Sequence, residues 1–308
     1  MLISTAVTGL LAYAAGQVLG LGLPLGWAFV FGALISPTDP VAVLAMLKTV
    51  RVPAALHGKI AAEALFNDGV GIVVFTIVIA LATQGSGGGH SATGLEAVRL
   101  FWVEAVGGAV LGLAAATAAT LVLKVLHEGP SVLLVTLALV GATYTLALRF
   151  GLSGPIAMVT AGMLLASPWA RRALDDGSRH EVFQFWELIE ELLNAVLFLV
   201  IGLELFALPI HIGDLAFALA AVAIVLTARL VSVLVPVALL APWTEFSPGA
   251  VPILTWAGLR GGISVALVLA LPDSPHKSAL LMATYATVVA SVIGQGLTMP
   301  WLVRRYYP

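Results

Sequence analysis

Long apolar runs alternate with short polar connections along the whole of this 308-residue chain. A helix that crosses a membrane needs roughly 20 mostly apolar residues, because the hydrocarbon core is about 30 Å thick. With that length as the measure, the pattern predicts about ten spans, and hence an all-α polytopic membrane protein. The spans are Leu2–Leu19, Leu23–Leu47, Leu56–Thr83, Val98–Leu126, Ser131–Arg149, Gly154–Ala170, Val182–Phe206, Leu215–Ala241, Pro248–Leu271 and Ser278–Val303.

The composition agrees with this pattern and excludes several classes of function. The chain is 60% hydrophobic and only 10% charged, whereas a soluble chain is about a quarter charged. It contains no cysteine, which rules out disulfides and thiolate metal sites, and its six histidines lack metal-ligand spacing. A net charge of −2 gives no reason to expect a nucleic-acid partner. We expect no cofactor and no enzymatic activity.

Lysine and arginine are unevenly divided between the two ends of the predicted spans. One side holds Lys48, Arg51, Lys59, Lys124, Arg171, Arg172, Arg179, Arg304 and Arg305, and the other holds Arg99, Arg149 and Lys277. Because basic residues accumulate in cytoplasmic loops, both termini of the chain as it stands are predicted to be cytoplasmic. The membrane we expect is the plasma (inner) membrane. Two further arginines, Arg229 and Arg260, fall inside spans.

Two spans are interrupted near their centres. Residues 36–40, with the sequence SPTDP, lie in the middle of the second span. Prolines three residues apart remove backbone hydrogen bonds and unwind a helix, while Asp39 followed by Pro40 suits the start of a new one. In the ninth span, Gly258–Gly262 places three glycines around Arg260. The sequence therefore predicts two discontinuous helices.

The interruptions occupy matching positions, in the second span from each end of the chain. Spans one to three and eight to ten form two triplets, and the four spans between them make the interrupted members run in opposite directions. Such an arrangement is an inverted repeat, and Gly/Pro-interrupted segments in corresponding halves indicate the midplane site of a secondary transporter.

The third span carries two carboxylates, Glu63 and Asp68, with Asn67 beside them. A charge in the bilayer costs roughly 3 kcal/mol or more, so that intramembrane ionisable residues mark ion or proton pathways. Asp68 lies near the middle of the span. Asn67 is one helical turn from Glu63 and shares its face. These residues predict an ion or proton site.

Five motifs in this order resemble the monovalent cation/proton antiporters of the NhaP/NHE type, which are sodium/proton exchangers. They are Ser36–Ala42 (SPTDPVA), Glu63–Gly69 (EALFNDG), Leu197–Glu204 (LFLVIGLE), Thr227–Arg229 (TAR) and Gly258–Gly262 (GLRGG). The resemblance implies the NhaA-like antiporter fold with two crossed discontinuous helices. It implies a transport domain made of residues 1–84 and 212–308, with residues 96–206 as the dimer-side scaffold and linking helix. A homodimer with elevator-like alternating access is implied as well.

By the same likeness, Asp68 binds the cation or the proton, with Asn67 as its neighbour and Thr38 as a ligand in the unwound stretch. Na⁺ would then be held at Asp68 and Thr38. The resemblance also pairs Glu63 with Arg229. It places Asp39 and Arg260 as compensating charges for the facing half-helix ends.

The chain departs from the family pattern in two ways. Family members usually carry about three more helices before the position of Met1, so we expect this chain to lack them. Many relatives have serine at the position of Ala64, which removes a hydroxyl ligand and leaves the preference among Na⁺, Li⁺ and K⁺ open. The pH optimum is open too. The sequence assigns no role to Glu104 or to the acidic group Glu187, Glu190 and Glu191.

We therefore predict an antiporter that exchanges Na⁺ (or Li⁺ or K⁺) for H⁺, in which both compete for one buried carboxylate. The exchange is predicted to be electroneutral. One rival is an intramembrane aspartyl protease that uses Asp39 and Asp68, since a pair of aspartates is its minimal requirement. A cation channel or a non-transporting sensor is the other.

Overall fold

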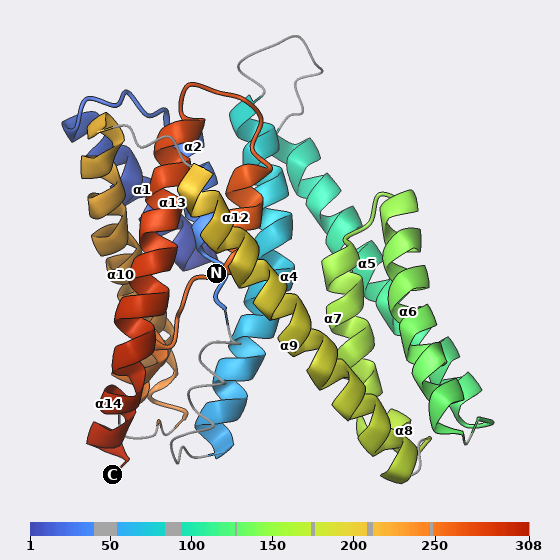
Figure 1. Ribbon diagram of the computed structural model, residues 1–308. Helices are drawn as coiled ribbons and strands as arrows, with labels where there is room; N and C mark the ends of the chain where they lie inside the picture. The colour runs from blue at the N-terminus through green and yellow to red at the C-terminus, as the bar shows by residue number, and fades with distance from the viewer. Residues whose placement is uncertain are drawn as a thin grey trace. The chain divides into compact units, whose positions relative to one another are not determined.

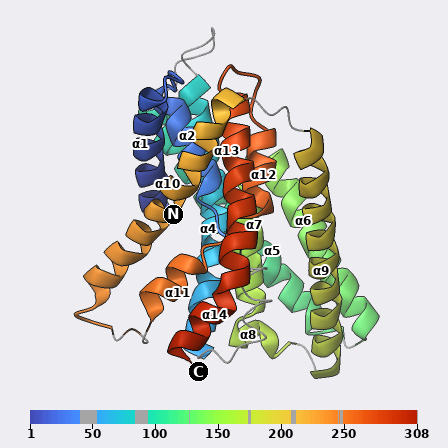
Figure 2. The same cartoon turned by 60° about the vertical axis from the view of Figure 1, so that its left-hand side comes forward.

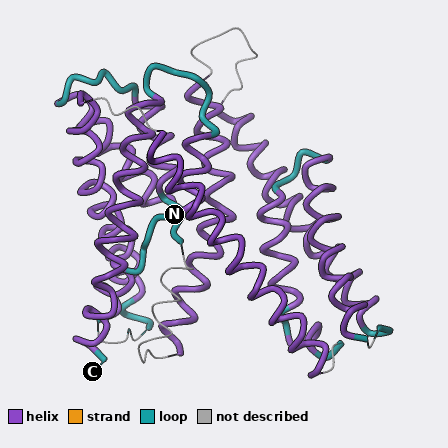
Figure 3. The backbone as a smooth tube through the Cα atoms, viewed as in Figure 1, coloured by secondary structure: helices purple, strands orange, loops and turns teal. Residues whose placement is uncertain are grey.

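The computed structural model describes residues 1–39, 54–83, 94–126, 128–173, 176–207, 212–244, 246 and 249–307. Within these residues every regular element is a helix, which confirms the all-α prediction (Figures 1 and 3). Two compact units are present. Unit 1 combines Met1–Gly88 with Phe198–Pro308, and unit 2 is Gly89–Leu197.

Four helical stretches in the described part of the chain are long and apolar enough to cross a membrane. They are Trp102–Leu123, Gly129–Arg149, Gly213–Leu240 and Lys277–Tyr306. Shorter apolar helices cover Leu2–Val18, Leu25–Ile35, Asn67–Thr83 and Gly154–Leu165. Every predicted span thus contains helical residues, although several are shorter or more broken than the apolar pattern alone suggested.

Unit 1 brings both ends of the chain together around one apolar core. Its helices are α1 (Leu2–Val18), α2 (Leu25–Ile35), α4 (Ala54–Thr83), α10 (Ile212–Leu240), α11 (Ala250–Trp256), α12 (Gly262–Leu269), α13 (Lys277–Val289), the π-helical turn η1 (Ala290–Gln295) and α14 (Gly296–Tyr306). Helix α1 packs on α2 and α10, and α10 packs on α13. Phe31 of α2 and Phe217 of α10 meet in the core with ring centroids 6.0 Å apart.

Close contact between α1 and α2 depends on Gly32. A Cβ atom at this position would overlap the Thr5 carbonyl of α1. Small residues at such positions let membrane helices approach closely, because van der Waals packing is what holds helices together in lipid. Because Gly32 lies in the last turn of α2, this contact holds the C-terminal end of the helix against α1.

Both predicted interruptions are present as non-helical segments within the described residues. Helix α2 ends at Ile35, and residues 36–39 are not helical. The half-helix expected after Asp39 lies outside the described residues. Helix α11 ends at Trp256 and α12 begins at Gly262, so that residues 257–261 form the second break. Helix α12 contacts both α2 and α13, and α11 packs on α10 and α14 (Figure 2).

Unit 2 is a separate helical bundle. It contains α5 (Gly94–Leu123), α6 (Gly129–Arg149), α7 (Gly154–Leu165), α8 (Pro168–Arg171) and most of α9 (Asp176–Ala207). Gly108 and Gly112 let α5 approach α7 so closely that a Cβ at either glycine would overlap a carbonyl of residues 153–157. The acidic group of α9, Glu187, Glu190 and Glu191, is exposed.

Two predicted spans are less regular than expected. The sixth ends as a helix at Leu165, and Ser167 then caps the short helix α8 through a hydrogen bond from the Ala170 N–H, with Pro168 in its first turn. Proline suits a first turn but not a helix interior, which explains the break. The tenth span contains the turn η1, which the apolar pattern does not reveal.

Candidate functional site

The first interruption begins at Ser36, whose side chain ties α2 to α1. Its hydroxyl donates to the Gly32 carbonyl at 2.6 Å and accepts from the Thr5 hydroxyl at 3.2 Å. Ser36 is 1% exposed. These hydrogen bonds hold the C-terminal end of α2 against α1. The carbonyl groups that follow this end face the second interruption.

Arg260 supplies the partner for those carbonyl groups. Its Nη1 donates to the Ser36 carbonyl, and to the Pro37 carbonyl at 3.0 Å. The side chain is 1% exposed, so it is a buried cation placed at the carboxyl end of a half-helix. The end of a helix carries a partial negative charge of about half a unit, which this cation offsets.

Asp39 makes the reciprocal contact from the first interruption to the second. Its backbone N–H donates to the Leu259 carbonyl at 2.7 Å. Its carboxylate occupies the space that a Cβ at Gly261 would fill, so that only glycine fits there. Gly261 is the N-cap of α12, and the carboxylate thus lies beside the positive end of that half-helix.

Helix α4 passes the first interruption at Asn67, which Asp68 follows in the chain. The Asn67 amide nitrogen donates to the Thr38 hydroxyl at 3.2 Å, and Gly71 brings the helix against the ring of Pro37. The Oδ1 atom of Asp68 is buried and has no hydrogen-bond partner among the described residues.

Glu63, one turn before Asn67 in α4, forms an ion pair with Arg229 of α10. The guanidinium binds the carboxylate through Nη1 and Nη2, with Nη2–Oε2 at 3.0 Å. Its Nε and Nη2 also donate to the Leu254 carbonyl near the end of α11, at 3.2 and 2.8 Å. Arg229 is 6% exposed, and Gly258 leaves the space that its guanidinium fills. The pair therefore joins α4, α10 and α11.

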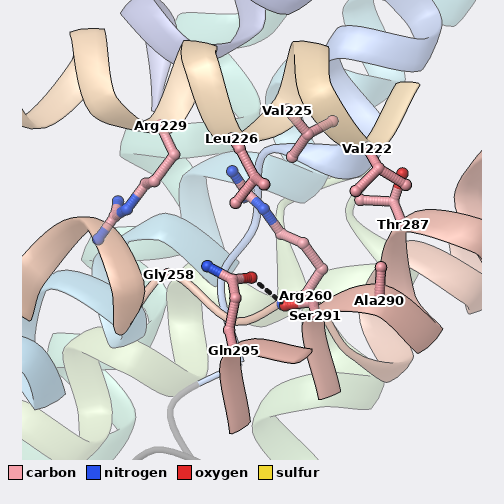
Figure 4. A pocket seen from close by; sticks show the side chains of 10 residues that line it. All are labelled: Val222, Val225, Leu226, Arg229, Gly258, Arg260, Thr287, Ala290, Ser291 and Gln295. Atoms are coloured by element: carbon pink, nitrogen blue, oxygen red, sulfur yellow. Dashed lines mark hydrogen bonds between the residues drawn. The ribbon is translucent and has the colours of Figure 1, made fainter. Parts of the chain in front are cut away.

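A small cavity of about 20 Å³ lies between α10 and the second interruption. Its lining residues are Val222, Val225, Leu226, Arg229, Gly258, Arg260, Thr287, Ala290, Ser291 and Gln295 (Figure 4). The Nε and Nη2 atoms of Arg260 are buried and have no hydrogen-bond partner within the described residues.

The predicted site residues all lie in unit 1, around the two interruptions. Thr38 and Asn67 are hydrogen-bonded, and Glu63 and Arg229 are ion-paired. The described part of the chain shows no hydrogen bond between Asp68 and Thr38. It also contains no group of three acidic, histidine or cysteine side chains that could hold a metal ion.

Sequence reasoning missed three contributors to this arrangement. The Leu254 carbonyl left no signal, because any residue supplies one. Ser291 and Gln295 contact the second interruption from η1. A signal for these two was available, since they are polar residues four apart in an otherwise apolar span.

Comparison with protein-family profiles gives a match over nearly the whole chain. The sequence profile described as "Sodium/hydrogen exchanger, transmembrane" matches residues 1–305. The chain belongs to this family. The family is one of membrane transporters, which confirms the predicted membership, the membrane location and the absence of enzymatic activity, and removes the protease alternative.

Two bacterial relatives cover nearly the whole chain. The Na⁺/H⁺ antiporter NhaP of Pseudomonas aeruginosa is 40% identical over 311 residues, a match that spans 100% of this chain and 72% of the relative. The Na⁺/H⁺ antiporter NhaH of Halobacillus aidingensis is 32% identical over 312 residues, covering 98% and 74%.

A solved structure supports the fold. The sodium proton antiporter MjNhaP1 from Methanocaldococcus jannaschii matches with a TM-score of 0.77 and 20% identity, over 99% of this chain and 77% of that one.

The Glu63–Arg229 pair is predicted to couple in a double-mutant cycle. Arg229→Ala should lower the free energy of unfolding by about 3 kcal/mol, because it leaves a carboxylate in low dielectric without its counter-charge. Glu63→Gln should cost less, and the double variant should cost less than the sum of the two losses. Denaturant titration of the purified protein measures these values. The exposed Arg149→Ala is the control, with a change within about 0.5 kcal/mol. Strictly additive losses would show that the pair contributes no coupling.

Proposed function

We propose that this chain exchanges Na⁺, or another small monovalent cation, for H⁺ across the membrane. The observation that carries the proposal is the buried Oδ1 atom of Asp68, which has no hydrogen-bond partner within the described residues. It belongs to a helix that also contacts Thr38 in the first interruption. The names of the two bacterial relatives agree with this activity.

The proposed mechanism is competition for one carboxylate. A charged carboxylate is costly inside the membrane, so the ionised Asp68 favours a partner that neutralises it, either a proton or a cation. Hard monovalent cations prefer oxygen ligands, such as a carboxylate, a hydroxyl and backbone carbonyls. Because Asn67 donates to Thr38, a lone pair of the Thr38 hydroxyl remains for a cation.

The other charges near the interruptions are held by fixed partners. Glu63 is paired with Arg229, Arg260 faces the end of α2, and Asp39 faces the start of α12. Removing any of these would leave a charge or a helix end uncompensated in low dielectric. We therefore assign them a supporting role, and Asp68 the transport role.

The remaining features of the family fold are proposals of the same kind. They comprise about ten spans, an inverted repeat and alternating access by an elevator-type movement. Unit 1 would be the transport domain, and unit 2 would supply the scaffold of a homodimer in the plasma membrane with cytoplasmic termini. A cation channel is the second candidate, and saturable proton-coupled flux distinguishes the exchanger from it.

Asp68→Asn is predicted to abolish exchange, because the amide has the same shape but cannot cycle between a proton and a cation. Proteoliposomes with a pH-sensitive dye measure the response to Na⁺, Li⁺ and K⁺, and thus also the cation preference. Glu104→Gln, the same type of change on α5 in unit 2, is the control and should retain wild-type flux. Proton flux in Asp68→Asn near the wild-type rate would remove Asp68 from its role.

The exchange is predicted to be electroneutral. Asp39, Glu63 and Asp68 carry three negative charges, and Arg229 and Arg260 carry two positive charges, which leaves one negative charge. One H⁺ or one Na⁺ neutralises it, and the amide of Asn67 holds no further proton. Flux in proteoliposomes should therefore not respond to a voltage set by valinomycin and K⁺. A gradient endpoint that follows the voltage would indicate a second proton carrier at Glu63 or Asp39.

A further inference from the structure

A π-helical turn interrupts the last long helix of unit 1. The turn η1 (Ala290–Gln295) separates α13 from α14 within the helical run Lys277–Tyr306. Single π-helical turns are rare, and those that occur often lie at functional sites. The mechanism above makes no use of this turn, although it lies beside the second interruption.

Ser291 and Gln295 are joined by a hydrogen bond (Figure 4), and further hydrogen bonds connect them to both ends of that interruption. The backbone N–H of Arg260 donates to the Ser291 hydroxyl at 2.9 Å, and this hydroxyl donates to Gln295 Oε1 at 2.7 Å. The Gln295 amide nitrogen then donates to the Trp256 carbonyl at 3.4 Å. Ser291 and Gln295 are 3% and 5% exposed. We call these two side chains the η1 clamp.

The clamp satisfies backbone groups that the break in the helix sets free. Trp256 is the last residue of α11, and Arg260 lies just before the N-cap of α12. Backbone groups within a membrane need partners inside the protein, since lipid supplies none. The clamp holds one donor and one acceptor at opposite ends of residues 257–261, and so fixes the course of the segment.

Hydrogen bonds fix the position of the segment on this side. A cavity of about 20 Å³, room for about one water molecule, lies between the clamp and α10, and both clamp residues line it (Figure 4). The Ser291 hydroxyl accepts from the Arg260 N–H and so holds the backbone at this point. Losing that bond would leave the Arg260 N–H without its acceptor and loosen the segment.

Arg260 connects the second interruption to the first. Its backbone is held by Ser291, while its guanidinium holds the carbonyls of Ser36 and Pro37. The next residue is Thr38, whose hydroxyl is the cation ligand in the proposed function. A path of direct contacts therefore runs from η1 to the cation site.

We propose that Ser291 and Gln295 are positioning residues that set the affinity of the cation site through Arg260. This inference rests on the proposed function for its effect on transport. The clamp itself is a structural claim that can be measured without transport. Neither residue contacts the cation.

Ser291→Ala tests both parts in the full-length chain. Hydrogen–deuterium exchange of residues 257–261 should become at least tenfold faster, because the Arg260 N–H loses its acceptor. In proteoliposomes the apparent KM for Na⁺ should rise about fivefold, as expected for the loss of one hydrogen bond, while the maximal rate stays within twofold of wild type. Ser291→Thr keeps the hydroxyl and should restore both values.

Thr284→Ala is the matched control, because within the described residues this buried hydroxyl of α13 bonds only to the Leu280 carbonyl of its own helix. It should change neither the KM nor the exchange of residues 257–261. If Ser291→Ala does not fold, Gln295→Met removes the donor to the Trp256 carbonyl and the acceptor of the Ser291 hydroxyl. The segment is then held less firmly at both ends, so that faster exchange of residues 257–261 and a higher KM are again expected.

Unchanged deuterium exchange in the clamp variants would overturn the clamp. Faster exchange with an unchanged KM would overturn the positioning role. If the wild-type protein itself shows no cation/proton exchange, the proposed function fails, and the deuterium measurement still decides the clamp.

Discussion

The arrangement of unit 1 depends on one constraint, the need to satisfy interrupted backbone inside a membrane. Each interrupted segment supplies hydrogen-bond partners for the other. Arg260 covers carbonyls at the end of α2, and the Asp39 N–H donates to the Leu259 carbonyl. Because these contacts are mutual, a movement of either segment would break hydrogen bonds of the other. The same constraint explains the required glycine at position 261, where a side chain would displace the Asp39 carboxylate.

In the proposed function, the other charged residues have fixed partners, and Asp68 is the group that gains and loses a proton or a cation. The ion pair of Glu63 with Arg229 and the charges at the half-helix ends have defined partners, whereas Asp68 keeps a buried oxygen without one in the described residues. Transport by competition needs such a group, held by a rigid surround that does not itself exchange protons. In the proposed function, the stability of the network and the transport role of Asp68 both depend on this one arrangement.

Sequence reasoning predicted the all-helical class, the two interruptions and the charged residues around them. These features follow from strong local signals: apolar runs of sufficient length, proline and glycine inside spans, and charges that are expensive in lipid. It did not predict the turn η1 or the contacts of Ser291 and Gln295, because their partners are backbone groups distant in sequence. The short helix α8 was missed for a local reason, since Ser167 and Pro168 lie within an otherwise apolar run. The family profile and the bacterial relatives then support the activity, which local patterns alone leave among several membrane functions.

The most direct test of the central claim counts the protons released when Na⁺ binds to the purified protein in weakly buffered detergent solution. If H⁺ and Na⁺ compete for Asp68, proton release should approach one per bound Na⁺ as the pH is lowered. Asp68→Asn should release none, while Glu104→Gln should match the wild type. Na⁺ binding by the wild type without proton release, or unchanged release from Asp68→Asn, would contradict the account.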